Sequence, residues 1–292
     1  MKHSAKIVAI LLGMFFLTQL IGIAVIYSYQ NNEYNLPYGM EPPKEISPGI
    51  SLISIVTAIA FAVLIMLIFM RFNIELLLRL WFLFVIIIAI GITINSAILH
   101  LPNSSIIALA IAVPLAILKV FKRGILVHNF TELMIYPGIA SIFVPILNLW
   151  TIILLFVIIS LYDIYAVWHS GFMQKMAKYQ IQKLKMFSGF FVPYLGAREK
   201  AQLARIKKTN AREKKIKVNV AILGGGDVVF PIIFAGVILR IFGFLPSLIM
   251  AFGATIALFV LFLFSKKGKF YPAMPFISAG CFLALGLIYA LF

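Results

Sequence analysis

The sequence predicts an all-α polytopic membrane protein with nine transmembrane helices. Three observations predict it: 63% of the 292 residues are hydrophobic, long apolar runs recur along the whole chain, and the basic residues are concentrated in alternate loops. A soluble domain contains roughly 45–50% apolar residues. An apolar run of ~20 residues is long enough to cross the hydrocarbon core of a bilayer.

The predicted spans are separated by charges, prolines or polar clusters. The first run follows Lys2 and Lys6, as in a signal peptide, but its length and the lack of a small-residue cleavage site favour a retained helix. The fifth run is short and is bounded by Glu132, Pro137 and Pro145. We expect spans at 7–27, 50–70, 76–99, 104–121, 131–147, 149–169, 218–239, 243–264 and 271–292.

The basic residues orient these spans. With a cytoplasmic amino terminus, 23 of the 25 lysines and arginines fall in cytoplasmic segments, and only Lys44 and Arg240 fall outside. This distribution obeys the positive-inside rule and places the carboxyl terminus outside. We expect an N-terminal six-helix part (1–170), a basic cytoplasmic loop on anionic lipid headgroups (171–216) and a C-terminal three-helix part (217–292). Basic residues beside membrane helices point to lipid rather than nucleic acid.

The sequence lacks the motifs that are usual in metal-dependent and serine-dependent proteases. The single cysteine, Cys281, excludes an intrachain disulfide, and His3, His100, His128 and His169 are scattered without ligand spacing. No His-Glu-x-x-His or Gly-x-Ser-x-Gly sequence occurs. We therefore predict no metal site and no cofactor.

Only two aspartates occur in the chain, and both lie inside apolar runs: Asp163 in the sixth predicted span and Asp227 in the seventh. The seven other acids are glutamates, and none is expected deep in an apolar run. A carboxylate at the bilayer centre costs at least ~2.5–3.5 kcal/mol, so a chain that carries two is expected to use them. Both aspartates lie ~9–15 Å inside the cytoplasmic boundary, at about 1.5 Å per residue.

Two carboxyls at matching depth suit two different functions. A close pair can share one proton and activate water, which predicts peptide hydrolysis. The same pair suits a proton or cation pathway, so an ion-coupled transporter or cation channel is the alternative.

Two further segments accompany these carboxylates. Gly224-Gly225-Gly226 directly precedes Asp227 and allows another backbone to approach, although tight helix packing explains it equally well. Pro272-Ala273-Met274-Pro275 opens the last span and keeps its backbone from forming a regular helix. Free amides there can meet an extended peptide, although proline at a helix start is also ordinary.

Together these segments resemble a known family. Leu161-Tyr162-Asp163, Gly224-Gly225-Gly226-Asp227 and Pro272-Ala273-Met274 resemble the YD, GxGD and PAL motifs of presenilin and signal peptide peptidase, in the same order and on the matching spans. The resemblance extends over essentially the whole chain. The chain is similar to a prokaryotic, archaeal-type homologue of presenilin.

The resemblance implies an intramembrane aspartyl protease with Asp163 and Asp227 as the catalytic pair. It also implies that Tyr162, the three glycines and Pro272 to Met274 shape the active site and bind substrate. Met274 replaces the usual leucine of PAL, and Gly225 occupies the variable position of GxGD. The expected partners are single-span membrane proteins or signal-peptide remnants, with a preference for substrates whose carboxyl terminus is cytoplasmic. The expected location is the plasma membrane of a prokaryote, and the sequence names no obligate protein partner.

Overall fold

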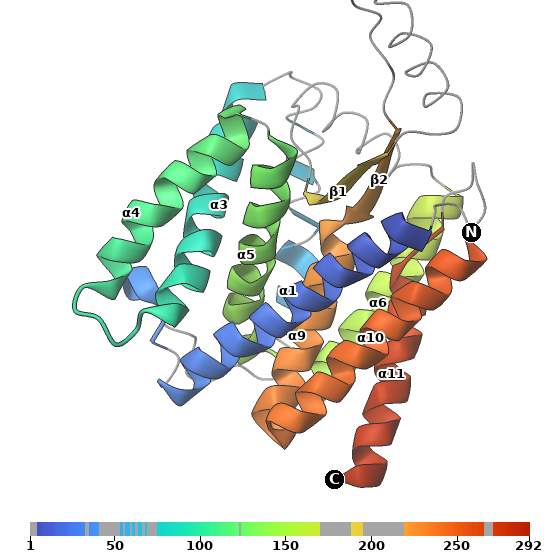
Figure 1. Ribbon diagram of the computed structural model, residues 1–292. Coiled ribbons are helices and arrows are strands. Elements are labelled where there is room, and N and C mark those ends of the chain that lie inside the picture. Colours follow the sequence, from blue (N-terminus) through green and yellow to red (C-terminus); the bar gives the residue numbers. More distant parts are fainter. Residues whose placement is uncertain are drawn as a thin grey trace, which may run out of the picture.

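The protein folds into a bundle of long helices with a small two-stranded sheet at one end (Figure 1). The computed structural model describes residues 5–32, 35–40, 75–122, 124–169, 188–194, 219–265 and 271–292, and parts of 53–68. Within these ranges, eight helices are long and apolar enough to cross a membrane. The start of α1 and the end of α11 lie at opposite ends of the bundle (Figure 1).

The helices follow the predicted spans closely. They are α1 (Ala5–Asn31), α3 (Glu75–Ala97), α4 (Ser104–Ile117) with a π-helical extension η2 (Leu118–Lys122), α5 (Ile125–Phe143) with a short 3-10 helix η3 (Val144–Ile146), α6 (Leu149–Trp168), α9 (Gly225–Phe242), α10 (Phe244–Phe264) and α11 (Met274–Leu291). A further 3-10 turn, η1 (Pro37–Gly39), follows α1. The predicted all-α membrane fold is thereby confirmed.

Two predicted span boundaries are wrong. The fifth helix begins at Ile125 rather than at residue 131, because His128 and Glu132 are accommodated inside it by hydrogen bonds and an ion pair. The seventh begins at Gly225 rather than at residue 218, because the preceding apolar residues form a strand. The predicted span at 50–70 lies in residues that are described only in part, so the count of nine and the orientation in the membrane stay predictions.

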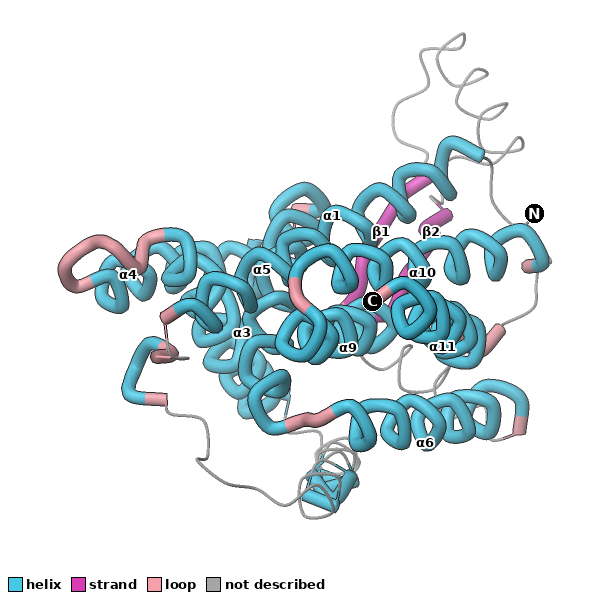
Figure 2. The backbone as a smooth tube through the Cα atoms, turned by 90° about the horizontal axis from the view of Figure 1, so that it is seen from below, coloured by secondary structure: helices cyan, strands magenta, loops and turns pink. Residues whose placement is uncertain are grey.

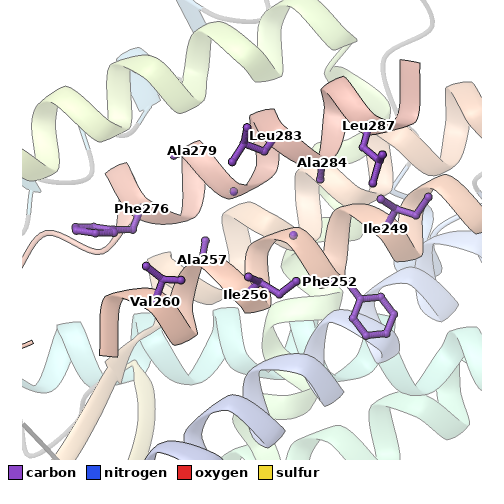
Figure 3. Close-up of a pocket in the computed structure, with 12 residues that line it drawn as sticks. Ile249, Phe252, Ile256, Ala257, Val260, Phe276, Ala279, Leu283, Ala284 and Leu287 are labelled. Atoms are coloured by element: carbon purple, nitrogen blue, oxygen red, sulfur yellow. The ribbon is translucent and has the colours of Figure 1, made fainter. Parts of the chain in front are cut away.

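Helix α9 lies at the centre of the bundle. It contacts α1, α5, α6, α10 and α11, and every residue from Pro231 to Leu239 is buried. Figures 1 and 2 show α3, α4 and α5 on one side of α9, and α6, α10 and α11 on the other. A helix that is apolar all round fits this central place.

The sheet was not predicted. Strands β1 (Gly189–Tyr194) and β2 (Asn219–Gly224) pair antiparallel, with Phe190 opposite Leu223. Side chains alternate across the sheet: Phe190 and Leu223 face the core, while Val220 and Ile222 are more than 40% exposed. This period of two is the signature of a half-buried strand. Strand β1 falls inside the segment interpreted as a basic loop, most of which lies outside the described residues.

An aromatic cluster holds together the three helices that carry the candidate site. Phe234 of α9 packs edge-on against Phe156 of α6, with ring centroids 4.8 Å apart, and against Phe282 of α11, at 6.3 Å. Edge-to-face pairs of this kind each contribute ~0.5–1.5 kcal/mol beyond their buried area. Each ring lies about two helical turns from the site residue on its own helix, so the cluster fixes the spacing of the helices close to that site.

Candidate active site

Asp163 lies on the buried side of α6. Its neighbours Leu161 and Tyr162 are exposed, whereas Asp163 is only 4% exposed. The backbone N–H of Met274 donates a hydrogen bond to Asp163 Oδ2 at 3.0 Å, and the backbone of Ala273 also bonds this carboxyl. The predicted sixth-span aspartate and the PAL-like segment therefore meet directly.

The start of α11 explains why amides are available to Asp163. Ala273 is the N-cap of α11 and Met274 its first residue, and the first N–H groups of a helix have no partner inside the helix. Pro272 and Pro275 carry no N–H group, so the two prolines add no further unpaired donors. The segment thus presents the amides of Ala273 and Met274 to one carboxylate.

A second contact between α6 and α11 lies next to this one. The hydroxyls of Ser160 and Ser278 are hydrogen-bonded at 2.7 Å. Ser160 precedes Asp163 by one helical turn, and Ser278 follows Met274 by one turn, so both bonds join the same two faces. This pair cannot be predicted from the sequence, because isolated serines in membrane helices carry no distinctive pattern.

Asp227 lies in the first turn of α9. Gly224 is the N-cap and Asp227 the third residue of the helix, and the Asp227 side chain hydrogen-bonds the backbone of Gly224. An acidic side chain at this position resembles the returning half of a capping box and complements the positive end of the helix dipole. Asp227 lies ~3 Å from the start of its helix, and Asp163 ~8 Å from the end of α6. Asp227 thus lies at the start of its helix, because the helix begins later than predicted, and its depth in the membrane stays a prediction.

Gly225 leaves no room for a side chain. A Cβ at this position would lie 2.6 Å from Ser188 Oγ and 2.8 Å from the hydroxyl oxygen of Tyr136. The Gly225 N–H donates to the carbonyl of Ser188 at 3.1 Å. Tyr136 is 1% exposed and packs edge-on against Phe190 of β1. Gly225 is thus required for close packing. Tight packing is one of the two interpretations that the sequence allows for these glycines, the other being the approach of a substrate backbone.

The backbone just after Asp227 is held from α1. Gln19 Nε2 donates to the carbonyl of Val228 at 3.1 Å across a buried contact. Four residues beyond Asp227 stands Pro231, which has no N–H for the Asp227 carbonyl. The first turn of α9 therefore depends on contacts from α1, α5 and β1 as well as on its own helical bonds.

The two carboxylates come together at one end of the bundle. They are close enough to interact electrostatically, and Asp227 is half-buried beside the exposed Gly226. Tyr162 is 46% exposed and lies within electrostatic reach of Asp163. Among the described residues, no group of three or more His, Cys, Asp or Glu side chains is placed to hold a metal ion. A carboxylate pair of this kind can carry out acid–base chemistry on a water molecule.

All predicted site residues lie in the described part of the chain. Asp163, Ala273 and Met274 contact one another, and Gly224, Gly225 and Asp227 form the turn into α9. Pro272 is buried next to them, whereas Tyr162 and Gly226 are exposed.

Comparisons with known proteins give matches over nearly the whole chain. The family model described as "Signal-peptide peptidase, presenilin aspartyl protease" matches residues 12–292. A solved structure of a presenilin family intramembrane aspartate protease in space group C222 is 20% identical and has a TM-score of 0.66, covering 98% of this chain and 99% of that one. A structure described in the same words in space group P2 is 21% identical with a TM-score of 0.65, covering 97% of both chains. The comparison with curated proteins gives no match.

Proposed function

We propose that this chain, which belongs to the signal-peptide peptidase and presenilin aspartyl protease family, uses Asp163 and Asp227 as the catalytic pair of an intramembrane aspartic endopeptidase. The contact that carries the proposal is the hydrogen bond from Met274 N–H to Asp163, beside an Asp227 close enough to interact with it. The substrates are peptide bonds within or near the transmembrane helices of other membrane proteins.

The proposed reaction needs one proton shared by the pair. The ionised carboxylate takes a proton from water, whose oxygen attacks the peptide carbonyl carbon, while the protonated carboxyl gives its proton to the carbonyl oxygen. The carboxyl that took the proton from water then gives it to the nitrogen as the C–N bond breaks, and one hydroxyl of the tetrahedral intermediate returns its proton to the other carboxylate, which restores the pair. Because both protonation states are needed at once, cleavage should have a bell-shaped dependence on pH that belongs to the pair.

The sheet beside Asp227 supports an extended binding mode for the substrate. Within the described residues, β2 pairs with β1 alone, and it continues directly into Gly224 and α9. A substrate segment that unwinds there can add to the open edge of β2 by backbone hydrogen bonds. Its peptide bonds would then pass the carboxylate pair. Single-span proteins with a cytoplasmic carboxyl terminus are the substrates that the predicted orientation favours.

The cellular setting is part of the same proposal. The protein is an integral membrane protein, and we place it in the plasma membrane of a prokaryote, with the basic residues that flank β1 in the 171–216 segment against anionic headgroups. The transporter alternative that the sequence raised gains no support from the comparisons.

Cleavage of a single-span substrate by the purified protein in detergent tests the function. Wild-type protein should cleave, Asp163→Ala and Asp227→Ala should not, and a transition-state inhibitor of aspartic proteases should block the wild type. Retained proteolysis in either variant contradicts the assignment. Absence of wild-type cleavage across several substrates, together with aspartate-dependent ion flux in liposomes, would favour the transporter.

A further inference from the structure

Two side chains of α5 bond the outer edge of β1. Asn129 Nδ2 donates to the carbonyl of Phe191 at 2.8 Å, and the Phe191 N–H donates back to Asn129 Oδ1 at 2.9 Å. One side-chain amide thus satisfies both backbone groups of one strand residue, as a neighbouring strand would. Two residues away, His128 Nε2 is 2.7 Å from the carbonyl of Gly189.

These bonds fix which edge of the sheet is open. Opposite residues in an antiparallel pair alternate between bonded and non-bonded pairs. Phe191 faces Ile222 in the register, and the N–H and C=O of Phe191 point to Asn129. Phe191 and Ile222 are therefore a non-bonded pair, so the N–H and C=O of Ile222 point away from β1. The edge of β2 that points away from β1 is the edge on which the proposed function relies.

A buried ion pair holds His128 in place. Lys119 Nζ, in η2, donates to Glu132 Oε1 at 2.6 Å, and both side chains are less than 10% exposed. His128 Nδ1 is 3.4 Å from Lys119 Nζ. Since a lysine ammonium only donates, Nδ1 is the acceptor there and Nε2 carries the proton that is given to Gly189. The His128 ring also stacks on Phe191, with centroids 4.7 Å apart.

One face of α5 continues this support to the catalytic turn. His128, Glu132 and Tyr136 follow one another at intervals of four residues, so they lie on the same side of the helix. Tyr136 contacts both Phe190 of β1 and the site of Gly225. The same face of α5 therefore sets the position of the strand and of the turn that carries Asp227.

We propose that Asn129 and His128 are positioning residues that occupy the outer edge of β1 in place of a third strand. They leave β2 as the edge at which a substrate strand adds, and they fix the register of the sheet in front of Asp227. This role rests on the proposed proteolytic function. Its consequence is control over which peptide bond reaches the carboxylate pair.

The test is the cleavage pattern of Asn129→Leu, which keeps the approximate volume of the side chain and removes both hydrogen bonds. We expect cleavage products to spread to neighbouring peptide bonds and kcat to fall roughly tenfold, with a smaller change in KM, since a sub-ångström misplacement at a reaction centre costs this much. Mass spectrometry of the products gives the pattern. Asn129→Asp, which keeps the acceptor for Phe191 N–H and loses the donor, should shift the pattern in the same direction but less.

The matched control is Asn95→Leu. Asn95 is a buried asparagine, whereas Asn129 is half-buried, and Asn95 donates to the Tyr29 hydroxyl between α3 and α1, away from the sheet. Asn95→Leu should lower stability without changing the cleavage positions. Unchanged positions and kcat in both Asn129 variants would overturn the proposal, and so would an equal change of pattern in Asn95→Leu.

A second measurement keeps the inference separate from the proposed function. Amide hydrogen exchange in β1 should accelerate in Asn129→Leu and stay unchanged in Asn95→Leu, whether or not a substrate is cleaved. Wild-type protein that cleaves no substrate would contradict the proposed function alone. Unaltered exchange in β1 of Asn129→Leu would contradict the positioning role itself.

Discussion

Replacing Gly225 by alanine tests the packing of the turn from β2 into α9, which carries Asp227. The added Cβ would lie 2.8 Å from the Tyr136 hydroxyl oxygen and 2.9 Å from its ring carbon Cε1. Ordinary contacts begin near 3.4 Å, so the turn or the ring must move by about 0.5 Å. Ser188 is exposed, so its side chain can rotate away, but Tyr136 is 1% exposed and packs against Phe190 of β1. The turn is therefore the part that moves.

The size of the effect follows from two opposing contributions. Overpacking of a close-packed site costs about 1–3 kcal/mol, and alanine recovers at most about 1 kcal/mol of helix propensity. We expect Gly225→Ala to lower the free energy of unfolding by about 1–2 kcal/mol. A displacement of half an ångström next to Asp227 should also lower kcat roughly tenfold.

The neighbouring glycine provides the control. A Cβ at Gly226 would meet only a ring carbon of Phe230 at 3.8 Å, an ordinary contact. Chemical denaturation in detergent should therefore show Gly226→Ala at least as stable as wild type. Wild-type stability and cleavage in Gly225→Ala, with Gly226→Ala as the destabilised variant, would refute the packing argument. The Gly225→Ala/Tyr136→Phe double variant should recover only part of the loss, because the Cε1 contact persists.

Two further predictions concern the supports of the site. Ser160→Ala and Ser278→Ala should each lower kcat several-fold with little change in KM, because each removes the hydrogen bond between α6 and α11 beside Asp163. The control is Ser141→Ala, since the Ser141 hydroxyl bonds only a carbonyl of its own helix. Its steady-state kinetics should be unchanged. Glu132→Gln should destabilise the protein by about 3–5 kcal/mol, since it leaves the buried charge of Lys119 unpaired. Lys119→Met should cost less, because His128 Nε2 lies 3.5 Å from Glu132 Oε1 and can still pair with it. Lys119→Met/Glu132→Leu should recover most of the loss seen in Glu132→Gln. A double-mutant cycle of unfolding free energies checks the second prediction, and equal losses in single and double variants would contradict it.

The sequence could predict the helices and the two aspartates, because both depend on local patterns. An apolar run of sufficient length dictates a membrane helix, and the cost of an isolated carboxylate marks Asp163 and Asp227 without any knowledge of their contacts. The meeting of Asp163 with Met274 could be expected only from the family resemblance. No periodicity within either helix encodes a contact between residues 111 positions apart.

Strand β2 could not be predicted, because its apolar residues belong to the same long apolar segment as the helix that follows. The whole segment therefore has the pattern of a single membrane helix. Residues Val220 to Leu223 lack the polar–apolar alternation that identifies a half-buried strand, and a short apolar run does not distinguish a strand from a helix. The burial of Glu132 inside α5 could not be predicted either. The expectation that no glutamate lies deep in an apolar run is wrong, because its partner Lys119 belongs to another helix and neutralises the charge there.

Each of the two aspartates is hydrogen-bonded by backbone groups at the amino-terminal end of a helix. Asp227 lies in the first turn of α9 and bonds the N-cap backbone of its own helix. Asp163 lies near the end of α6 and bonds the first amides of α11. The amino ends of two helices thus converge on one carboxylate pair, and each end contributes free N–H groups and a partial positive charge. A pair that shares one proton carries one negative charge, and these two helix ends provide the hydrogen bonds that water would otherwise supply. The two prolines at the start of α11 fit this geometry, since they add no unpaired donor there, whereas Gly225 is required by its packing against Tyr136.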